Sequence, residues 1–198
     1  MSTAHHKRLT NPYEPLSVLS DDQIATIHDS AVQYLADEGI RITFDEARTT
    51  LTDAGAATSA GEDLIVRFDP DAVAAAIEAA PSEFEMHAPN PQHNLTVGQR
   101  SVALMPVAGP PFVSDRLRGR RAGTMRDQEN FLKLTQSYDV MAATAPCAEP
   151  TDIPLNVRHL RSWLATLTLT DKLPFIYSRG RRRVRDGFDL IKLRHGID

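Results

Sequence analysis

Residues 102–124 read VALMPVAGPPFVSDRLRGRRAGT and contain a strand pattern, a rigid break and a helix start in direct succession. The nearly continuous apolar run over 101–107 is typical of a strand buried on both faces of a parallel sheet. Gly109-Pro-Pro111 then stops the run, because two prolines fix φ and the glycine permits close backbone approach. Residues 112–121 predict a charged hairpin, and Thr124-x-x-Asp127 is a capping box that predicts the next helix.

The same order of strand and helix recurs twice further along the chain. An apolar run over 140–146 precedes a helical pattern over 154–169. Residues 173–177 are a third predicted strand, and 184–195 are a third predicted helix. Three strand–helix units in succession favour an α/β fold with a parallel sheet, either doubly wound or a barrel.

The number of these units is small for either architecture. A closed (β/α)8 barrel takes eight units and roughly 250 residues, and a doubly wound sheet usually takes five or six strands. Three units would leave parallel edges open. We therefore expect residues 1–198 to be the amino-terminal piece of a longer protein, with an incomplete barrel of about three β/α units.

A different pattern precedes residue 101. Ser20-Asp-Asp-Gln23 is a capping box that predicts a helix ending at Gly39, and a second short helix fits 45–54. Asp69 before Pro70 predicts the start of an Ala-rich helix, and short strands are predicted at 64–68, 83–87 and 94–97. We expect a flexible tail over 1–15, an α+β segment over 16–100 and the first β/α units over 101–198.

The composition excludes several classes of function. The net charge is -4, which argues against nucleic acid or anionic lipid as a partner, and no apolar run approaches the roughly 20 residues that span a bilayer. A single cysteine and the lack of a signal peptide in the first residues predict a cytoplasmic protein. The histidines show no metal-ligand spacing, so we expect no bound metal, and no Walker, GxGxxG or GxSxG motif is present.

Loops at the carboxyl ends of parallel strands are the expected place for a site. After the first strand, Gly109 and Asp115 delimit a candidate rim over the mouth of the barrel, although a plain connector is the simpler interpretation. After the second strand, Glu149 and Asp152 could orient a cation or act as acid and base. Asp152 also suits a cap on the helix predicted from Pro154, whereas Glu149 has no such alternative.

Three further features remain open from the residues alone. Tyr177 ends the third strand, where its ring could face a cation or simply fill the core. The arginine run over 179–185 could bind nucleic acid or phosphate, but without interleaved aromatic residues and with an acidic net charge a solvated face is the simpler interpretation. Cys147 could be a nucleophile or a ligand, yet its sequence neighbours include no His or Cys to activate it.

The ordered motifs of the chain resemble those of the trimethylamine methyltransferase family, including its non-pyrrolysine members that demethylate glycine betaine and related quaternary amines. The likeness runs over about residues 16–178, and no single motif in it is diagnostic. It is carried by LSDDQI at 19–24, LADEGI at 35–40, DAGA at 53–56, APS at 80–82, NP at 90–91, GPPFVSD at 109–115, GRR at 119–121, TMRD at 124–127, EPTDIP at 149–154 and TDKLP at 170–174.

The resemblance implies a (β/α)8 TIM barrel behind a helical amino-terminal segment. It also implies transfer of a methyl group from a small methylated amine to the cobalt of a corrinoid that a separate partner protein presents, so no cofactor is expected to bind this chain directly. The full-length protein could form a homo-oligomer. The resemblance places no catalytic residue within 1–198, and the position of pyrrolysine in the family would lie beyond Asp198.

The expected chemistry gives the loop residues a role. A quaternary amine has no proton to remove, so an enzyme must hold the cation in a carboxylate or aromatic cage and align one methyl group with the acceptor. Glu149 and Tyr177 are the residues we predict for that cage. Two other classes of function stay open: a barrel lyase or aldolase that holds an anionic substrate through Arg118, Arg120 or Arg121, and a non-catalytic interaction module that docks through 181–183.

Overall fold

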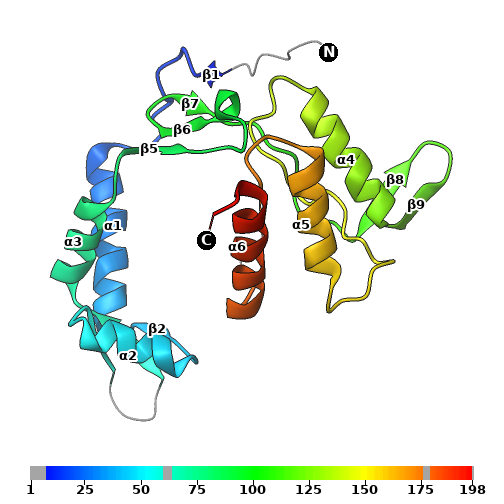
Figure 1. Cartoon of the computed structure of the whole chain (residues 1–198). Coiled ribbons are helices and arrows are strands. Elements are labelled where there is room, and N and C mark those ends of the chain that lie inside the picture. The colour runs from blue at the N-terminus through cyan, green and yellow to red at the C-terminus, as the bar shows by residue number, and fades with distance from the viewer. Residues whose placement is uncertain (1–7, 60–63, 176–178, 198) are drawn as a thin grey trace. The chain divides into compact units, whose positions relative to one another are not determined.

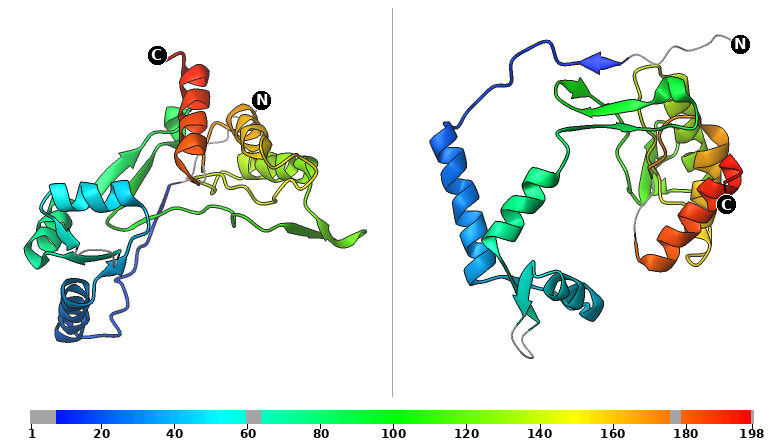
Figure 2. Two further views of the ribbon diagram at one scale, coloured as in Figure 1. Left: turned by 90° about the horizontal axis from the view of Figure 1, so that it is seen from below. Right: turned by 60° about the vertical axis from the view of Figure 1, so that its left-hand side comes forward.

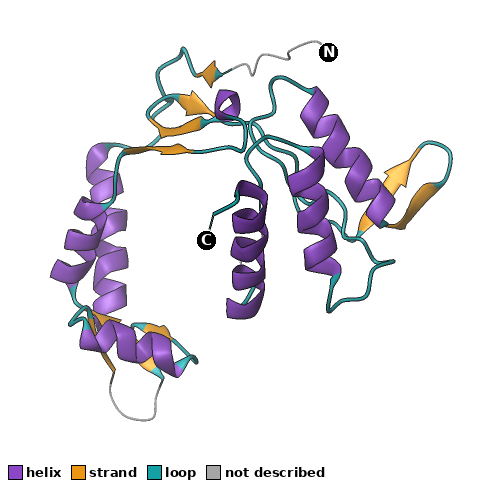
Figure 3. Cartoon of the chain, in the orientation of Figure 1, coloured by secondary structure: helices purple, strands orange, loops and turns teal. Residues whose placement is uncertain are grey.

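The computed structural model describes residues 8–59, 64–175 and 179–197, and the chain divides into two compact units. The smaller unit is Tyr13–Ser82, and the larger unit combines Met1–Pro12 with Glu83–Asp198. Figure 1 gives the order of the elements along the chain, and Figure 3 distinguishes helices from strands. The fold is mixed α/β, and its sheets are small and antiparallel.

The described residues of the smaller unit form three α-helices and one sheet. The strands have the order β2-β4-β3 and are antiparallel, with Ile40 opposite Val66 and Ala57 opposite Phe68. Helix α1 packs against α3 and against β4. The elements are α1 (Asp21–Asp37), β2 (Ile40–Arg41), α2 (Asp45–Asp53), β3 (Ala57–Ser59), β4 (Ile65–Phe68) and α3 (Pro70–Ala79).

Local capping chemistry sets the helix starts in this unit as the sequence predicts. The Ser20 side chain accepts a hydrogen bond from the Gln23 amide, and the Gln23 side chain accepts one from the Ser20 amide, so the capping box is confirmed. The Asp69 side chain accepts from the amides of Asp71 and Ala72 at the start of α3. These bonds satisfy amide groups that have no partner inside the helix.

Gly39 lies where the chain turns from α1 into β2, and it approaches the backbone of β4 closely. Its φ is +75°, and a Cβ there would lie 2.4 Å from the carbonyl oxygen of Val66. Only glycine combines a left-handed φ with so little space. The turn therefore fixes α1 against the central strand β4.

Replacement of Gly39 by alanine is expected to destabilise the smaller unit by well over the ~1–2 kcal/mol that left-handed backbone alone costs a residue with a Cβ. Gly55→Ala is the matched control, because Gly55 has a φ of +67° but no atom within 4 Å of the added Cβ. Urea denaturation of both variants, followed by circular dichroism, measures the two losses. Equal losses would show that the contact with Val66 contributes nothing.

The described residues of the larger unit form three antiparallel strand pairs, three α-helices and one short 3-10 helix. The pairs are β1 with β7, β5 with β6, and β8 with β9, and the last is the charged hairpin that the sequence predicts. Figure 2 shows α4 and α5 side by side from two further directions. The elements are β1 (Leu9–Thr10), β5 (Glu83–Met86), η2 (Pro91–His93), β6 (Leu95–Gly98), β7 (Ser101–Val102), β8 (Phe112–Asp115), β9 (Gly119–Ala122), α4 (Met125–Ser137), α5 (Arg158–Leu169) and α6 (Arg181–His195).

The three segments predicted as parallel strands lie beside one another, but their described residues pair through isolated bridges instead of strands, and residues 176 and 177 of the third lie outside the described residues. Leu104 bridges Met141 and Ala143 bridges Leu173, both in parallel orientation. The Ala142 amide donates to the Leu104 carbonyl and the Thr144 amide to the Leu173 carbonyl, both at 2.8 Å. The described residues therefore contain parallel neighbours in the predicted order, and they form no closed barrel.

The predicted burial of 101–107 is wrong. Ser101 and Val102 form a two-residue strand with β1, and Leu104, Met105 and Val107 are 40%, 43% and 79% exposed. A strand becomes buried on both faces only when other elements cover both faces, and elements of the described chain leave these side chains open. The second run differs, since Ala142, Thr144 and Ala145 are buried.

The helices of the larger unit follow the sequence closely, with one correction. Helix α5 begins at Arg158 rather than at 154, because turns closed by Pro150 and Pro154 precede it. Met125 and Leu132 of α4 pack with Ala165 of α5 in one core cluster. No helix in the described ranges is long and apolar enough to cross a membrane.

Candidate functional site

The loops after the first two parallel segments are bound to each other through their backbones. The Gly109 amide donates to the Pro146 carbonyl, and the Glu149 amide donates to the Pro110 carbonyl, both at 2.9 Å. Gly109 has a φ of +91°, which favours glycine at this point. Glu149 is thus held by the Gly-Pro-Pro break in which the apolar run ends.

Gly123 extends this contact between the loops. Its amide donates to the Pro111 carbonyl at 3.0 Å, and its carbonyl accepts from both the amide and the hydroxyl of Thr151. A Cβ on Gly123 would lie 2.8 Å from the backbone oxygen of Glu149. The hairpin β8–β9 therefore ends directly against the Glu149 loop.

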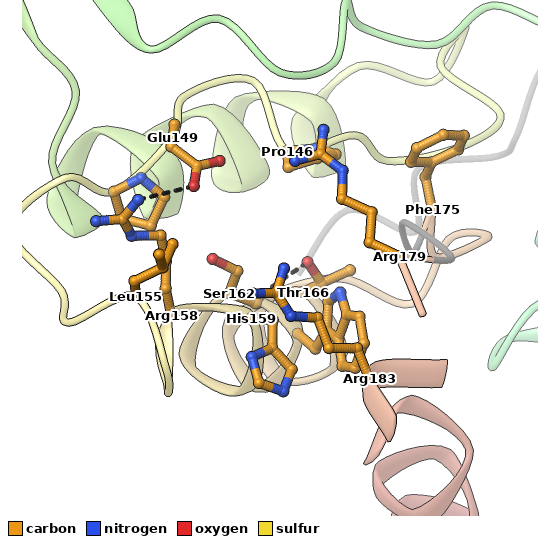
Figure 4. Close-up of a pocket in the computed structure, with 12 residues that line it drawn as sticks. Pro146, Glu149, Leu155, Arg158, His159, Ser162, Thr166, Phe175, Arg179 and Arg183 are labelled. Carbon is orange, nitrogen blue, oxygen red and sulfur yellow. Dashed lines mark hydrogen bonds and ion pairs between the residues drawn. The ribbon is translucent and has the colours of Figure 1, made fainter. Parts of the chain in front are cut away.

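A cavity of about 60 Å³ lies between the Glu149 loop, helix α5 and the segment that leads into α6 (Figure 4). All of its walls belong to the larger unit. It follows the second and third parallel segments in the chain, so its place agrees with the rule for sites in parallel α/β folds. Its lining residues are Pro146, Glu149, Pro150, Leu155, Arg158, His159, Ser162, Trp163, Thr166, Phe175, Arg179 and Arg183.

Glu149 forms an ion pair inside this cavity. Its Oε1 atom accepts a hydrogen bond from Nη1 of Arg158 at 3.0 Å, and the Arg158 Nε atom donates to the carbonyl of Ile153 at 3.0 Å. Glu149 is the one acidic residue among the lining residues. Arg158 therefore offsets much of the negative charge that the sequence assigns to a cation cage.

His159 and Trp163 form the α5 side of the cavity. The Nε2 atom of His159 lies 2.8 Å from Oδ2 of Asp186 on α6, and the His159 ring meets the Trp163 ring edge-on with centroids 5.2 Å apart. The Nδ1 atom of His159 is buried and has no hydrogen-bond partner in the described structure. The carboxylate thus joins α5 to α6 and orients the imidazole.

The arginine run divides between the cavity and the solvent. Arg179 and Arg183 line the cavity, and of these two only Arg183 is half-buried, whereas Arg179 is exposed, as are Arg182 and Arg185. Figure 4 shows Arg179 and Arg183 on one side of the cavity and Glu149 with Arg158 on the other. The predicted solvated face is therefore confirmed for part of the run only.

Of the residues predicted for the site, Glu149 lines the cavity and Tyr177 lies outside the described residues. The two predicted rim residues are absent from the lining. Gly109 fastens the loops together, and Asp115 closes the turn of the hairpin by accepting from the amides of Leu117 and Arg118. These bonds lower the pKa of the Asp115 carboxyl below its ordinary value, and the bond from the Arg118 amide has the largest effect.

The hairpin arginines have intramolecular partners. Arg118 pairs with Asp115 at 2.8 Å, and the Arg120 guanidinium lies 3.8 Å from the centre of the Phe112 ring. Arg121 makes two hydrogen bonds of 2.6 Å to Asp127. This geometry does not favour the anion clamp of a lyase or aldolase, which needs guanidinium groups that face a common cavity.

Asp152 caps a helix, but not the helix that the sequence suggests. Its Oδ1 atom accepts from the Met125 amide of α4 at 2.8 Å, whereas α5 begins without a side-chain cap. The capping box of Thr124 and Asp127 at the same helix start is confirmed. Two loops thus converge on the first turn of α4.

Cys147 is buried, and its thiol donates to the Ala145 carbonyl at 3.3 Å. Burial raises the pKa of the thiol, which disfavours the reactive thiolate. In the described part of the chain, no cluster of three or more His, Cys, Asp or Glu residues could hold a metal ion.

Sequence reasoning missed most of the cavity wall. Trp163 and Phe175 look like ordinary core residues in their helix and strand patterns, and Arg158 and His159 stand in a stretch expected to be mid-helix. Arg179 precedes α6 and Arg183 lies in its first turn, so no helical spacing in the sequence indicates that both line one cavity.

The Arg121–Asp127 pair supplies a prediction on pH. Hydrogen bonds from Arg121 hold the pKa of Asp127 far below its usual range, so the pair stabilises the fold above the unfolded-state pKa of about 4 and this contribution fades as pH falls. Asp127→Asn is expected to lower the free energy of unfolding by ~1–2 kcal/mol at pH 7. The difference from the parent chain should shrink below about pH 4.

Chemical denaturation of both chains at a series of pH values measures this difference. Asp189→Asn is a suitable control, because Asp189 is exposed on α6. A pH-independent difference for the Asp127 variant would show that the carboxylate charge is not what stabilises the helix start.

Comparison with known proteins adds evidence of relationship. The sequence model of the family described as trimethylamine methyltransferase (MTTB) matches residues 1–198. A glycine betaine methyltransferase from Desulfitobacterium hafniense (strain Y51) is 29% identical over 181 residues, which cover 91% of this chain and 37% of that protein. The trimethylamine methyltransferase MttB from D. hafniense (strain DSM 10664 / DCB-2) is 25% identical over 171 residues, which cover 86% of this chain and 34% of that protein. The chain thus spans about a third of the length of these relatives.

Proposed function

Because the chain belongs to the trimethylamine methyltransferase family, we propose that it takes part in methyl transfer from a methylated or quaternary amine to the cobalt of a corrinoid on a partner protein. The match of the family model to the whole chain is the observation that carries this proposal. We further propose that the three strand–helix units belong to a (β/α)8 barrel, in agreement with the two parallel bridges.

Acid–base groups contribute little to the proposed methyl transfer. In the proposed step the C–N bond breaks with its electron pair left on nitrogen. The methyl group moves to cobalt(I), which supplies both electrons of the new bond and becomes cobalt(III). The protein must hold the cation and align one methyl group with the acceptor, so positioning is the main contribution of its side chains.

The cavity contains groups suited to holding a cation. Trp163 and Phe175 offer aromatic rings, and Glu149 offers a carboxylate at the end of the second parallel segment. Tyr177 remains a proposed member of the same cage. Since Arg158 already pairs with Glu149, a cationic substrate must compete with the guanidinium for that carboxylate.

This competition gives two substitutions of opposite effect. Glu149→Gln is expected to weaken binding of a quaternary ammonium compound by about 3- to 10-fold, because it removes the one carboxylate of the cavity. Arg158→Gln is expected to strengthen binding by a similar factor, because it frees Glu149 and removes a repelling cation.

Isothermal titration of the chain with tetramethylammonium and choline measures both effects. Glu78→Gln serves as the control, since Glu78 is exposed on α3 in the other unit. Methyl transfer is then followed from the spectral change of cob(I)alamin on methylation. Absence of binding and of methyl transfer with a panel of methylated amines would overturn the proposed function for this chain.

A further inference from the structure

The smaller unit has very little core. Among its described residues, Ala57 and Val66 are the apolar residues that are buried, and helices α1, α2 and α3 contain no buried residue. A small unit buries a small share of its apolar surface by itself, so it gains stability when another surface covers the rest.

The uncovered apolar side chains form an open groove of about 520 Å³ within this unit. The groove lies between the end of α1, helix α2, the sheet and one face of α3. Every residue that lines it is apolar, and the larger ones are Leu35, Ile40, Leu51, Phe68, Val73 and Ile77.

The surroundings of this groove are acidic. Exposed carboxylates stand within one or two positions of lining residues, at Asp37, Glu38, Asp53, Asp69 and Asp71. The whole unit contains 14 Asp and Glu residues against 3 Lys and Arg residues, which gives a formal net charge of -11. An occupant that combines an exposed apolar side chain with positive charge is therefore complementary to the groove.

The larger unit carries the opposite charge and presents such an element. It contains 12 Asp and Glu residues against 19 Lys and Arg residues, a formal net charge of +7. The hairpin β8–β9 extends away from α4 (Figure 1), and residues 112–122 contain four Arg and one Asp. At its turn, Leu117 is 94% exposed between Arg116 and Arg118, which are exposed as well.

The turn of the hairpin is held in one conformation by its own hydrogen bonds. The Asp115 carboxylate accepts from the amides of Leu117 and Arg118, at 3.0 Å and 2.7 Å. The leucine is thus presented on an ordered turn, and little conformational entropy remains to be lost when it binds.

We propose that the hairpin of one chain docks in the acidic groove of the smaller unit of a second copy. Leu117 enters the apolar groove, and Arg116 and Arg118 lie on its acidic rim. Because the contact joins two different surfaces, it is heterologous: each chain uses its hairpin on one neighbour and its groove on another. The contact uses no residue of the cavity around Glu149, so it does not rest on the proposed function.

Sedimentation velocity over a range of protein concentrations tests this contact. The chain is expected to self-associate, and less so at about 500 mM salt than at about 50 mM, because salt screens exposed charges. Leu117→Gln and Ile77→Gln should each weaken the association at least about 10-fold. Ile77 is 57% exposed in the groove, so neither substitution removes a buried contact of the single chain. Leu193→Gln is the matched control, since Leu193 is 78% exposed on α6, outside both surfaces.

An equimolar mixture of the two variants gives a sharper test. The Leu117→Gln chain keeps its groove and the Ile77→Gln chain keeps its hairpin, so the mixture retains one competent pair of surfaces. It should form a species of two chains that neither variant forms alone. Equal melting temperatures of the variants and the parent chain establish that the fold is intact. If Ile77→Gln lowers the melting temperature, Asp53→Lys replaces it, because Asp53 is exposed at the end of α2.

The outcomes decide between a second copy and any other occupant of the groove. A chain that stays monomeric at every concentration overturns the proposal, whether a segment of the same chain or a different protein then fills the groove. Association that persists unchanged in the Leu117→Gln chain, or a mixture no heavier than its components, also overturns it. Loss of association in both variants and its recovery in the mixture, with the Leu193→Gln chain unchanged, support it.

Discussion

The contact between two proline-rich loops is the constraint on which the cavity depends. These loops have few amide donors, because they contain the prolines at 106, 110, 111, 146 and 150. The amides of Gly109, Gly123 and Glu149 all donate hydrogen bonds that join the loops. Such bonds replace the longer strand ladder that the parallel segments lack. They fix the backbone of Glu149, and through it the carboxylate that meets Arg158. The rigid break at Gly109-Pro-Pro111, after the first apolar run, is therefore needed to hold the Glu149 loop, which follows the second apolar run and forms one wall of the cavity.

A buried lysine performs the corresponding task at the other end of α4. Lys172 is 1% exposed, and its ammonium donates to the carbonyls of Thr135 at 2.8 Å and Tyr138 at 2.5 Å, where the helix ends. Burial lowers the pKa of Lys172, while the bonds to helix carbonyls satisfy the charge. Its neighbour Asp171 accepts from Asn90 and Gln136, so η2, α4 and the third parallel segment are tied together. Helix α4 is thus anchored at both ends, by loops at its start and by a lysine at its finish.

The features that the sequence predicts well are those decided within a few residues. Ser20 with Gln23 and Thr124 with Asp127 begin helices where their capping boxes indicate, because the bonds close over three residues. Burial is not local in this sense: the runs at 101–107 and 140–146 have similar composition, yet only the second is covered by other elements. The site is also hard to predict because its contacts join residues that are distant in the sequence. Asp152 looks like a cap for the helix that follows it, but its carboxylate reaches an amide 27 residues earlier.

The cavity also shows why charge counted along the chain is a poor guide to charge at a site. The whole chain carries a net charge of -4, and the arginine run looks like a solvated surface beside it. In the fold, two of those arginines turn toward a cavity in which Glu149 is the one acidic residue. The sum of charges over the chain therefore does not give the charge of the groups that line the cavity.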